Sequence, residues 1–285
     1  MRLRPLVLLA ALAAGTMTAA EEKPVSGDTL SIVTLNIYHD RADWPARRPL
    51  VIEGLKALEP DVIVLQEVLQ HETLRNQAED IAEALGYESW FVSTDPPEQA
   101  RRYGNAILSR HRILERSGHR LEPLDDSRTL AHARLDVRGN VVDVYGTHLH
   151  HTPEGEGIRA RQVRHLLSII AKREGDAPSL LMGDFNAPVT ARELEPLFER
   201  YIDVYGEFNE EAAGITTLNP HYFEPARQGR IDHIFAERGR FEILDARRVL
   251  DRPDESGTWP SDHFGVYTRL SFATGAKLRQ RATSP

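Results

Sequence analysis

Acidic, amide and histidine side chains that could hold a cation and move protons recur in six short motifs. Each motif ends an apolar, β-branched run or directly follows one, so we expect strand ends to bring the motifs to one cleft. Oxygen ligands suit a hard cation such as Mg²⁺, and imidazoles suit proton transfer. The combination predicts metal-assisted hydrolysis of a phosphate ester. In chain order the motifs are LNI with Asn36, LQE with Glu67, GTHLH with His148, GDFN with Asp184 and Asn186, RIDH with Asp232, and SDH with Asp262 and His263.

The GDFN motif would carry two kinds of polar group into one site. Side chains two positions apart on an extended chain point to the same face, so Asp184 and Asn186 should enter the cleft together. The carboxylate could bind a cation while the amide orients a phosphoryl oxygen or an attacking water. The alternative interpretation is an Asp that begins a turn with an Asn cap.

Glu67 and Asn36 each end a continuous apolar strand. Glu67 follows VIVLQ, and burying a carboxylate there is costly unless it is paired or bound to a metal. A metal ligand is therefore favoured over a surface charge. Asn36 closes SIVTLNI, where an ordinary strand-end asparagine is an equal alternative.

The histidines follow two strands. Alternation along VVDVYGTHLHH would put His148 and His150 on one face, and we favour a functional role for His148 more than for His150. SDH joins Asp262 directly to His263, and a carboxylate that orients an imidazole is the recurring unit of acid–base chemistry. We expect Asp232 to pair with His263, leaving Asp262 to the metal or the water. A turn or helix cap is the alternative for SDH.

The N-terminal segment has the pattern of a secretory signal. Basic MRLR precedes a short apolar core, and small residues stand before Glu21. We expect residues 1–20 to be removed and the protein to be periplasmic or secreted; an uncleaved membrane anchor is the alternative. Residues 28–272 should form one catalytic domain, and residues 273–285 a basic, disordered tail.

Composition limits the possible partners. The chain has no cysteine, which excludes disulfides and thiolate metal sites. A net charge of −8 argues weakly against a broad nucleic-acid footprint, although Arg101 and Arg102 could serve phosphate. A second arginine cluster, at 159–164, fits a solvated helix face better. No later segment is apolar enough to cross a bilayer, and we expect a monomer.

Apolar runs of strand length are mixed with helical spacing. A hairpin is expected around Gly139, and the segment 207–229 should be a long surface loop. The mixture predicts two mixed sheets packed face to face with helices outside. The expected strands are 31–37, 62–68, 89–94, 105–109, 130–137, 141–149, 179–185, 231–236 and 266–270, and the expected helices are 47–58, 71–85, 157–173 and 191–200.

The motifs, in this order, resemble the endonuclease/exonuclease/phosphatase superfamily, which has the deoxyribonuclease I-like fold. The resemblance spans Asn36 to His263. It implies an α/β fold, a four-layer α/β sandwich of two mixed β-sheets flanked by helices, and hydrolysis of phosphate esters with Mg²⁺, or with Mn²⁺ or Ca²⁺ in its place. By this resemblance Glu67 is the main metal ligand, Asn36 is close by, and Asp262 is associated with the metal or the water.

The resemblance also assigns the remaining roles. Asp184 and Asn186 would orient the attacking water and the scissile phosphate. His263, held by Asp232, would be the general base or a phosphate-stabilising imidazole. His148 would contact the phosphate or assist the leaving group.

The subfamily is less defined. THL with His148 resembles the bacterial-type sphingomyelinases and the two-histidine deoxyribonuclease I group. Asn105, in YGNAILSR, matches a segment that borders the cleft, and His150 is expected to contact substrate. Leu69 stands where an arginine that enters the DNA minor groove would be expected. There is also no long aromatic hairpin of the membrane-inserting kind.

The sequence therefore predicts an exported, Mg²⁺-dependent phosphodiesterase. Water would attack phosphorus in line, and the substrate would be a phospholipid head group or a small phosphodiester. A secreted nuclease with DNA or RNA as its substrate is the first alternative. The second is a non-catalytic binding module on the same scaffold, which the presence of every expected acidic and histidine position opposes.

Overall fold

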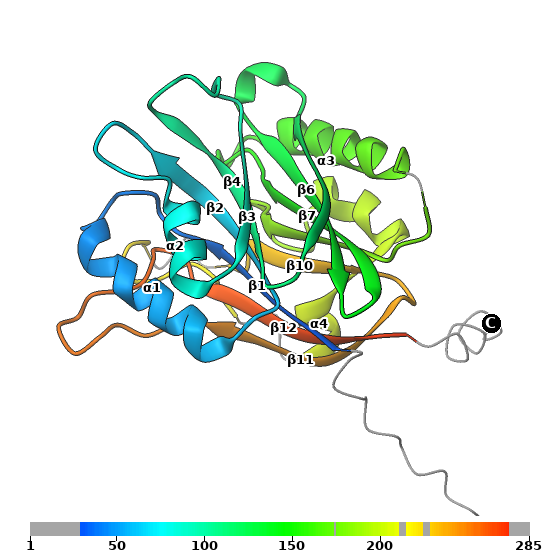
Figure 1. The fold of residues 1–285 in the computed structure, drawn as a ribbon. Helices are drawn as coiled ribbons and strands as arrows, with labels where there is room; N and C mark the ends of the chain where they lie inside the picture. The colour runs from blue at the N-terminus through cyan, green and yellow to red at the C-terminus, as the bar shows by residue number, and fades with distance from the viewer. Residues whose placement is uncertain (1–28, 174, 211–214, 225–228, 274–285) are drawn as a thin grey trace, which may run out of the picture.

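Two six-stranded mixed sheets pack face to face in the computed structural model, and helices cover their outer faces (Figure 1). The structure describes residues 29–173, 175–210, 215–224 and 229–273. The arrangement confirms the predicted four-layer α/β sandwich. The predicted signal at 1–20 lies outside the described residues, as does the predicted tail from 274 onward.

The first sheet has the strand order β11-β12-β1-β2-β4-β3. Its central pair, β1 and β2, is parallel, and the other neighbours are antiparallel. Helices α1 (Trp44–Leu58) and α2 (Gln77–Leu85) pack on its outer face. The strands are β1 (Thr29–Asn36), β2 (Val62–Gln70), β3 (Glu88–Ser93), β4 (Arg102–Ser109), β11 (Phe241–Val249) and β12 (Gly265–Phe272).

The second sheet has the order β5-β6-β7-β8-β10-β9 and again one parallel pair, β7 and β8. Helix α3 (Glu156–Ala171) and the 3₁₀ helix η2 (Arg192–Glu199) pack on its outer face. Two short helices, η1 (Leu124–Asp126) and α4 (Val204–Phe208), lie in connections. The strands are β5 (Ile113–Arg120), β6 (Thr129–Val137), β7 (Asn140–His148), β8 (Ser179–Asp184), β9 (Tyr201–Asp203) and β10 (Asp232–Glu237).

Apolar residues form three buried clusters, one between each pair of neighbouring layers. The central cluster joins the inner faces of the two sheets, with Val64 and Val144 among its members. The sheets approach each other closely at Gly146, where an added Cβ would lie 2.5 Å from Cγ1 of Val64. A side chain at this position would force the sheets apart.

The structure adds three strands that the hydrophobic pattern does not predict: β5, β9 and β11. They are edge strands of the two sheets, and β5 (ILERSGHR) and β11 (FEILDARRV) carry many charged residues. A strand with one open edge and a solvated face has no need of an apolar run.

Two expected helices were wrong in part. The segment predicted as a helix from 71 begins as a turn, and α2 starts only after Asn76, whose side chain accepts hydrogen bonds from the backbone N–H groups of Ala78 and Glu79. The expected helix at 191–200 is the 3₁₀ helix η2, which contains Pro196. Proline removes a backbone donor and disfavours a regular α-helix.

The segment 207–229 was expected to be a surface loop, and that expectation fails where the segment meets the strand ends. Thr217 and Asn219 are buried, and Leu218 forms an isolated bridge with His263. Residues 211–214 and 225–228 of the segment lie outside the described residues. None of the helices in the described part of the chain is long and apolar enough to span a membrane.

Candidate active site

Asp184 lies at the centre of the group of polar residues at the strand ends. It is the last residue of β8, where its Cα is paired with that of His148 on β7 and that of Asp232 on β10. Strand register therefore sets a histidine on one side of this carboxylate and a second carboxylate on the other. Asn36, the last residue of β1, and His263, just before β12, reach the same point from the first sheet.

Three nitrogen atoms surround one oxygen of Asp184. Nδ2 of Asn36 donates to Oδ2 of Asp184 at 3.1 Å. The Nε2 atoms of His148 and His263 lie 3.4 Å and 3.9 Å from the same oxygen. The other oxygen, Oδ1, accepts from the backbone N–H of Asn186 at 2.8 Å. All five residues are ones that the sequence motifs selected.

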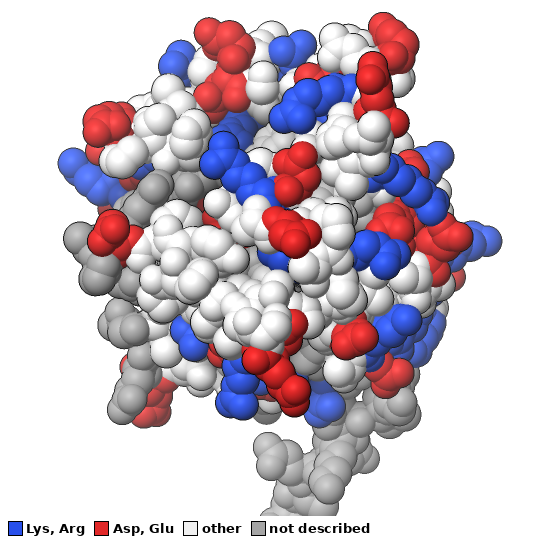
Figure 2. Space-filling view, turned by 90° about the vertical axis from the view of Figure 1, so that its left-hand side faces the viewer, with Lys and Arg blue, Asp and Glu red and all other residues white. Residues whose placement is uncertain are grey.

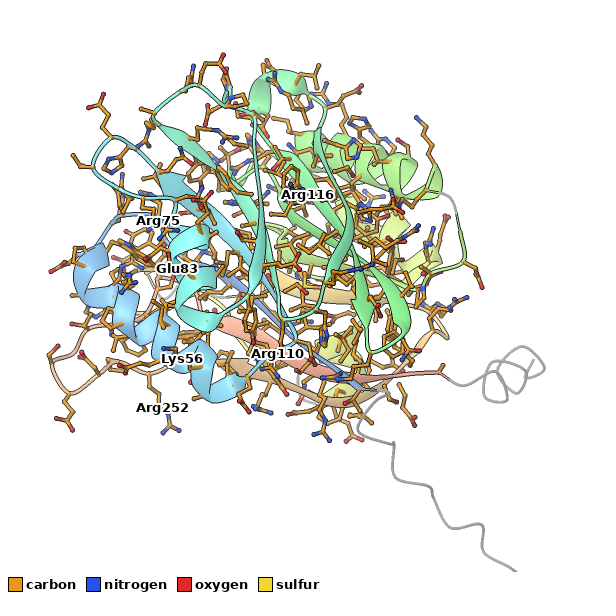
Figure 3. The ribbon with its side chains drawn as sticks, in the orientation of Figure 1. Lys56, Arg75, Glu83, Arg110, Arg116 and Arg252 are labelled. Carbon is orange, nitrogen blue, oxygen red and sulfur yellow. The ribbon has the colours of Figure 1, made fainter. Side chains whose placement is uncertain are left out.

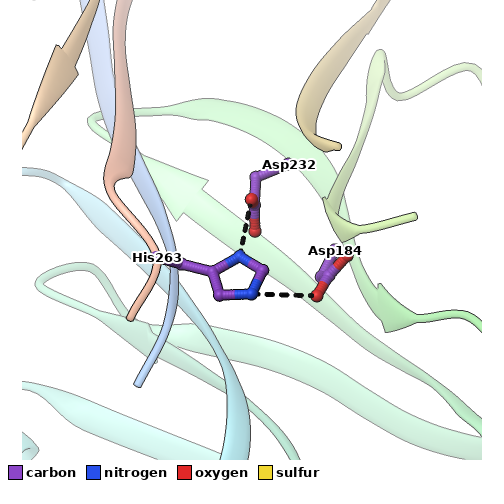
Figure 4. A group of neighbouring side chains, drawn as sticks. All are labelled: Asp184, Asp232 and His263. Atoms are coloured by element: carbon purple, nitrogen blue, oxygen red, sulfur yellow. Dashed lines mark hydrogen bonds and ion pairs between the residues drawn. The ribbon is translucent and has the colours of Figure 1, made fainter. Parts of the chain in front are cut away.

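The predicted pairing of Asp232 with His263 is present in the structure. Oδ2 of Asp232 and Nδ1 of His263 are 2.8 Å apart, and the other ring nitrogen faces Asp184 (Figure 4). The Asp232 side chain is fully buried, and its Oδ1 has no hydrogen-bond partner among the described residues. A carboxylate in this position fixes the ring orientation and favours the imidazolium form.

Burial and neighbouring charges shift the pKa values of the central groups in different directions. Burial, reinforced by Asp232, raises the pKa of Asp184 to about 7. Burial alone would lower the pKa of His263, but the Asp232 and Asp184 carboxylates raise it well above its usual value. Burial, with a contribution from the Arg128 charge, lowers the pKa of His148 far below its usual value. At neutral pH the site thus holds one cationic and one neutral imidazole.

A backbone irregularity positions Glu67. Leu65 pairs with Ala106 and Val68 with Gly104, so two residues of β2 oppose the single Asn105 of β4. Glu67 in this bulge has a left-handed backbone with φ of 59°. A bulge of this kind redirects a side chain at a functional site. Here Glu67 faces a cavity of about 510 Å³ that His39, Arg101 and Tyr103 also line.

Asp262 and Asn36 lie on the side of the first sheet. Asp262 is buried, and Oδ1 accepts from Oγ of Ser261 at 3.3 Å. Burial raises the pKa of Asp262 to about 6, and the Glu67 carboxylate also raises it. Oδ1 of Asn36 accepts from the backbone N–H of Tyr38. Two carboxylates thus lie close enough to repel each other, which a divalent cation would relieve.

The chemistry of these donors fits a divalent cation. Asp184, Asp232 and His263 offer ligand atoms that lie within 4.8 Å of one another and form a candidate metal site. Carboxylate oxygens are the donors that hard divalent ions prefer, whereas imidazole suits ions such as Zn²⁺. The orphaned Oδ1 of Asp232 supplies a buried acceptor that a cation or a proton could satisfy.

Asn186 does not reach the site by strand alternation with Asp184, as the sequence predicted. β8 ends at Asp184, and Asn186 has a left-handed backbone with φ of 51°. Its Nδ2 donates to the carbonyl oxygen of Leu149, while its backbone N–H holds Asp184. The residue therefore fixes the Asp184 carboxylate and the end of β7 to each other.

The two predicted substrate residues have different surroundings. Asn105 is buried, donates to Thr129, and borders a small cavity that His148 also lines. His150 was expected on the same face as His148, but β7 ends at His148, so the alternation stops there. The ring nitrogens of His150 contact Asp126 at 2.6 Å and Thr152 at 2.8 Å instead of the Asp184 group.

The sequence motifs missed three residues of this region. Arg128 and Tyr103 border the small cavity beside His148, and His39 lies 4.0 Å from Glu67. The Arg128 side chain is 11% exposed, and its Nε has no hydrogen-bond partner among the described residues. Arg128 and His39 stand in or beside strand connections, and Tyr103 is the second residue of β4. No local pattern marks the three residues, so only their positions in space reveal them.

A family model described as the Endonuclease/Exonuclease/phosphatase family matches residues 33–263. The chain belongs to this family. The buried group around Asp184 and the family together identify a metal-dependent phosphoesterase. When bound, the ion in such enzymes polarises a phosphoryl oxygen and stabilises charge on the leaving oxygen.

Named members of the family that resemble the chain include nocturnin and TDP2. Nocturnin of Drosophila melanogaster is 26% identical over an alignment that covers 85% of this chain and 47% of nocturnin, so the chain spans about half of that relative. The similarity to nocturnin and TDP2 does not support the narrower resemblance to sphingomyelinases and deoxyribonuclease I.

Solved structures of family members share the fold. An endonuclease/exonuclease/phosphatase from Beutenbergia cavernae is 25% identical, with a TM-score of 0.71 over 86% of this chain and 72% of the other. TDP2 from D. rerio, in complex with a single-strand DNA product, is 20% identical, with a TM-score of 0.72 over 85% of this chain and 99% of the other.

The residues around Asp184 can perform the proton chemistry of this family. A carboxylate with a pKa of about 7 can take a proton from water near neutral pH. The imidazolium of His263, held at Nδ1 by Asp232, can stabilise negative charge on a phosphoryl oxygen through Nε2. His148, kept neutral, leaves Asp184 without a second cation beside it.

Proposed function

We propose that the protein is an exported, Mg²⁺-dependent phosphodiesterase that cleaves a small phosphodiester or a phospholipid head group. The observation that carries the proposal is the convergence of two histidine Nε2 atoms on Oδ2 of Asp184, at 3.4 Å and 3.9 Å. A general base beside one cationic and one neutral imidazole suits attack by water on phosphorus and departure of an alkoxide.

Mg²⁺ would be held chiefly by Glu67, with Asp262 and Asn36 nearby. Glu67 is partly exposed to its cavity and has no arginine or lysine partner within 4.0 Å among the described residues. Asp232 is a poorer ligand, because Oδ2 already binds Nδ1 of His263. This assignment leaves Asp184, Asp232 and His263 free for proton chemistry.

The surface supports a compact substrate over a long nucleic acid. Leu69 occupies the position where an arginine that enters the DNA minor groove would be expected. It is fully buried and cannot contact a substrate. On the face shown in Figure 2, basic and acidic side chains are interspersed, and the described residues there form no continuous basic strip. Long nucleic acids are held mainly by rows of lysine and arginine.

Export is supported by the N-terminal pattern of basic, apolar and small residues before Glu21. The absence of cysteine agrees with a metal site built from oxygen and imidazole in any compartment. Export is tested by expressing the full-length gene and locating its product. A protein in the periplasmic or culture fraction with its N-terminus at or near Glu21 would support export. A full-length N-terminus in the membrane fraction would contradict it.

A substrate panel tests the activity. The full chain is assayed with Mg²⁺ and with EDTA on bis-p-nitrophenyl phosphate, p-nitrophenyl phosphate, sphingomyelin and a single-stranded oligonucleotide. We expect EDTA-sensitive turnover of the diesters and weak turnover of the monoester. Hydrolysis of none of these substrates by the Mg²⁺-loaded protein would contradict the proposal.

A nuclease is the second candidate function. Arg101 lines the Glu67 cavity and Arg128 borders the neighbouring one, so two guanidinium groups lie near the candidate site. The assay on the single-stranded oligonucleotide decides between the two functions. Turnover of the oligonucleotide far above that of the small diesters, falling steeply with added salt, would favour the nuclease.

A further inference from the structure

A groove of about 1040 Å³ lies on the outer face of the second sheet, between β5–β7 and helix α3. Its volume is at the upper end of the range for sites that bind small organic molecules. None of the described residues that line it belongs to the group around Asp184. Any chemistry in this groove is therefore separate from that of the candidate active site.

Strand register brings a serine, a histidine and an aspartate together at this groove. Ser117 on β5 pairs directly with His132 on β6. Asp143 on β7 pairs with Arg134, which is two positions after His132 and so points to the same face of β6. Asp143 is therefore the diagonal cross-strand neighbour of His132. The alanines before and after His132 pack in the central cluster, which leaves His132 on the outer face of the sheet.

The two ring nitrogens of His132 connect the serine to the aspartate. Oγ of Ser117 lies 3.3 Å from Nδ1, and Nε2 lies 2.8 Å from Oδ1 of Asp143. A hydroxyl beside a base that a carboxylate orients is the arrangement of a serine hydrolase, which is recognised by geometry and roles and not by chain order. The distance from nucleophile to base is often somewhat long before a substrate binds. Nδ1 faces the serine here, and either nitrogen of an imidazole can act as the base.

The carboxylate at one end sets the direction of these hydrogen bonds. Burial alone would raise the pKa of Asp143, but hydrogen bonds from His132 and Arg134 hold it below its usual value. An ionised Asp143 can only accept, so Nε2 of His132 donates to it and Nδ1 of the neutral ring accepts from Ser117. Nε2 of His119 lies 3.2 Å from the same hydroxyl oxygen and can donate to it.

The base is shielded while the hydroxyl can be reached. His132 is 1% exposed, and the Tyr145 ring lies beside the imidazole with centroids 4.7 Å apart. Ser117 is partly exposed and lines the groove. Asp143 also pairs with Arg134 at 2.8 Å, so it supports the protonated imidazole less than an unshared carboxylate would. We therefore expect a slow reaction.

We propose that this groove is a second reaction site, in which Ser117 attacks a carboxylic ester and His132 is the base. Oγ forms a bond to the acyl carbon, and its proton moves to Nδ1. The bond to the alcohol oxygen then breaks as the alcohol takes that proton. Water next attacks the acyl carbon and gives a proton to Nδ1, which returns it to Oγ as the carboxylic acid leaves. The N–H of His119, close to Oγ, can donate to the oxyanion that forms.

Diisopropyl fluorophosphate tests the nucleophile, because it forms a stable bond to an activated serine oxygen. The full chain is treated with it in EDTA, which suppresses the metal-dependent activity, and peptide mass spectrometry locates the adduct. Hydrolysis of p-nitrophenyl acetate is followed in the same buffer. We expect the adduct on Ser117 and measurable ester turnover. Ser117→Ala should lose both, with a melting temperature near that of the wild type, because the hydroxyl is partly exposed.

His132→Gln separates the base from its structural role. The glutamine amide can still donate to Asp143, but it offers Ser117 no base. We expect labelling and ester turnover to fall about a hundredfold or more, the usual contribution of a general base. A purely structural histidine would leave the labelling rate of the folded variant unchanged.

A thiol at the same position gives a measurement that does not depend on His132→Gln. The chain has no cysteine, so Ser117→Cys introduces a single thiol. An imidazole beside it should favour the thiolate, and alkylation by iodoacetamide near pH 6 should be about tenfold faster than in Ser256→Cys. Ser256 is exposed, and its hydroxyl contacts Asp254 and Thr258 instead of a histidine.

Ser168→Ala and His165→Gln are the matched controls for labelling. Ser168 on α3 donates to the carbonyl oxygen of His165 and not to a base. His165 lines the groove, but its Nδ1 accepts from the backbone N–H of Glu122. Both variants should be labelled on Ser117 at the wild-type rate.

Four results would overturn the second site. They are an unlabelled wild type, an adduct on another residue only, ester turnover that persists in Ser117→Ala, and equal alkylation of the two thiol variants. The proposal is independent of the phosphodiesterase function, because every measurement is made in EDTA and concerns residues outside the group around Asp184.

Discussion

Asn36 and Asp184 are 148 positions apart in the chain, yet Nδ2 of the first donates to Oδ2 of the second at 3.1 Å. Asn36 ends β1 of one sheet, and Asp184 ends β8 of the other. The contact therefore joins the two halves of the sandwich at the edge where the parallel strands terminate. Acid–base residues and candidate metal ligands from both sheets meet at this edge.

Asp184→Asn should reduce kcat on bis-p-nitrophenyl phosphate by about a hundred- to ten-thousand-fold, the usual contribution of a general acid–base group. The amide keeps the shape and can still accept from Asn186, so the melting temperature should not fall. Asp176→Asn, at a side chain that is 96% exposed, is the control. Turnover near the wild-type rate in Asp184→Asn would rule out this carboxylate as the base.

Asp232→Asn should move the pH profile of kcat toward acid. The Asp232 carboxylate raises the pKa of His263, so its neutralisation lowers that pKa. Activity that needs the imidazolium is present below the pKa of His263 and is lost as pH rises through it. The alkaline limb should therefore begin at lower pH, and His263 ring resonances followed by NMR should shift with it. An unchanged limb would contradict the pairing.

Glu67→Gln should raise the Mg²⁺ concentration for half-maximal turnover about tenfold or more, because even indirect supporters of a metal ligand contribute ten- to a hundredfold to affinity. EDTA should abolish turnover in the wild type. Glu83→Gln is the control, because Glu83 is an exposed residue of α2 that pairs with Arg75 (Figure 3). Equal Mg²⁺ requirements in the two variants would remove Glu67 from the metal site.

Arg47→Met should lower the free energy of unfolding by about 3 kcal/mol or more, since it leaves several buried carbonyl groups without a donor. Arg47 is fully buried and donates to five carbonyl oxygens, including that of Pro260 beside the SDH motif. Arg48→Met removes a partly exposed surface pair with Asp80 and should cost less than about 1 kcal/mol. Urea unfolding measures both, and similar losses would contradict the role of Arg47.

Asp61→Asn should lower the free energy of unfolding at pH 7. It should also make that free energy fall less as the pH is lowered. Burial alone would raise the pKa of Asp61, but hydrogen bonds from His111 and Ser31, with the Arg138 charge, hold it well below its usual value. A depressed carboxyl pKa stabilises the fold above about pH 4, the unfolded value, and this contribution disappears as pH falls.

Urea unfolding at pH 7 and pH 3 measures the Asp61 effect. Asp125→Asn is the control and should keep the wild-type pH dependence, because Asp125 is exposed and has no such contacts with the residues that the structure describes. If Asp61→Asn also kept that dependence, the carboxylate would have no part in acid sensitivity.

Much of the sandwich could be predicted from sequence because buried strands are marked by local apolar runs. β2, β7 and β8 all follow this rule. His148 and Asp184 end β7 and β8, whereas Glu67 lies in a bulge inside β2. The edge strands β5 and β11 were not predicted, because they are exposed on one side and need no apolar run. Where a strand stops is also a tertiary matter: β7 ends at His148, which sends His150 to Asp126.

By itself the sequence determined the chemical types that meet at the strand ends, since residue identity and strand periodicity are local properties. Only the tertiary structure decided their geometry. The bulge that turns Glu67 into its cavity exists because β2 and β4 pair with unequal numbers of residues. The charge of His263 depends on carboxylates from β8 and β10. These features arise from contacts between distant segments, which no local pattern encodes.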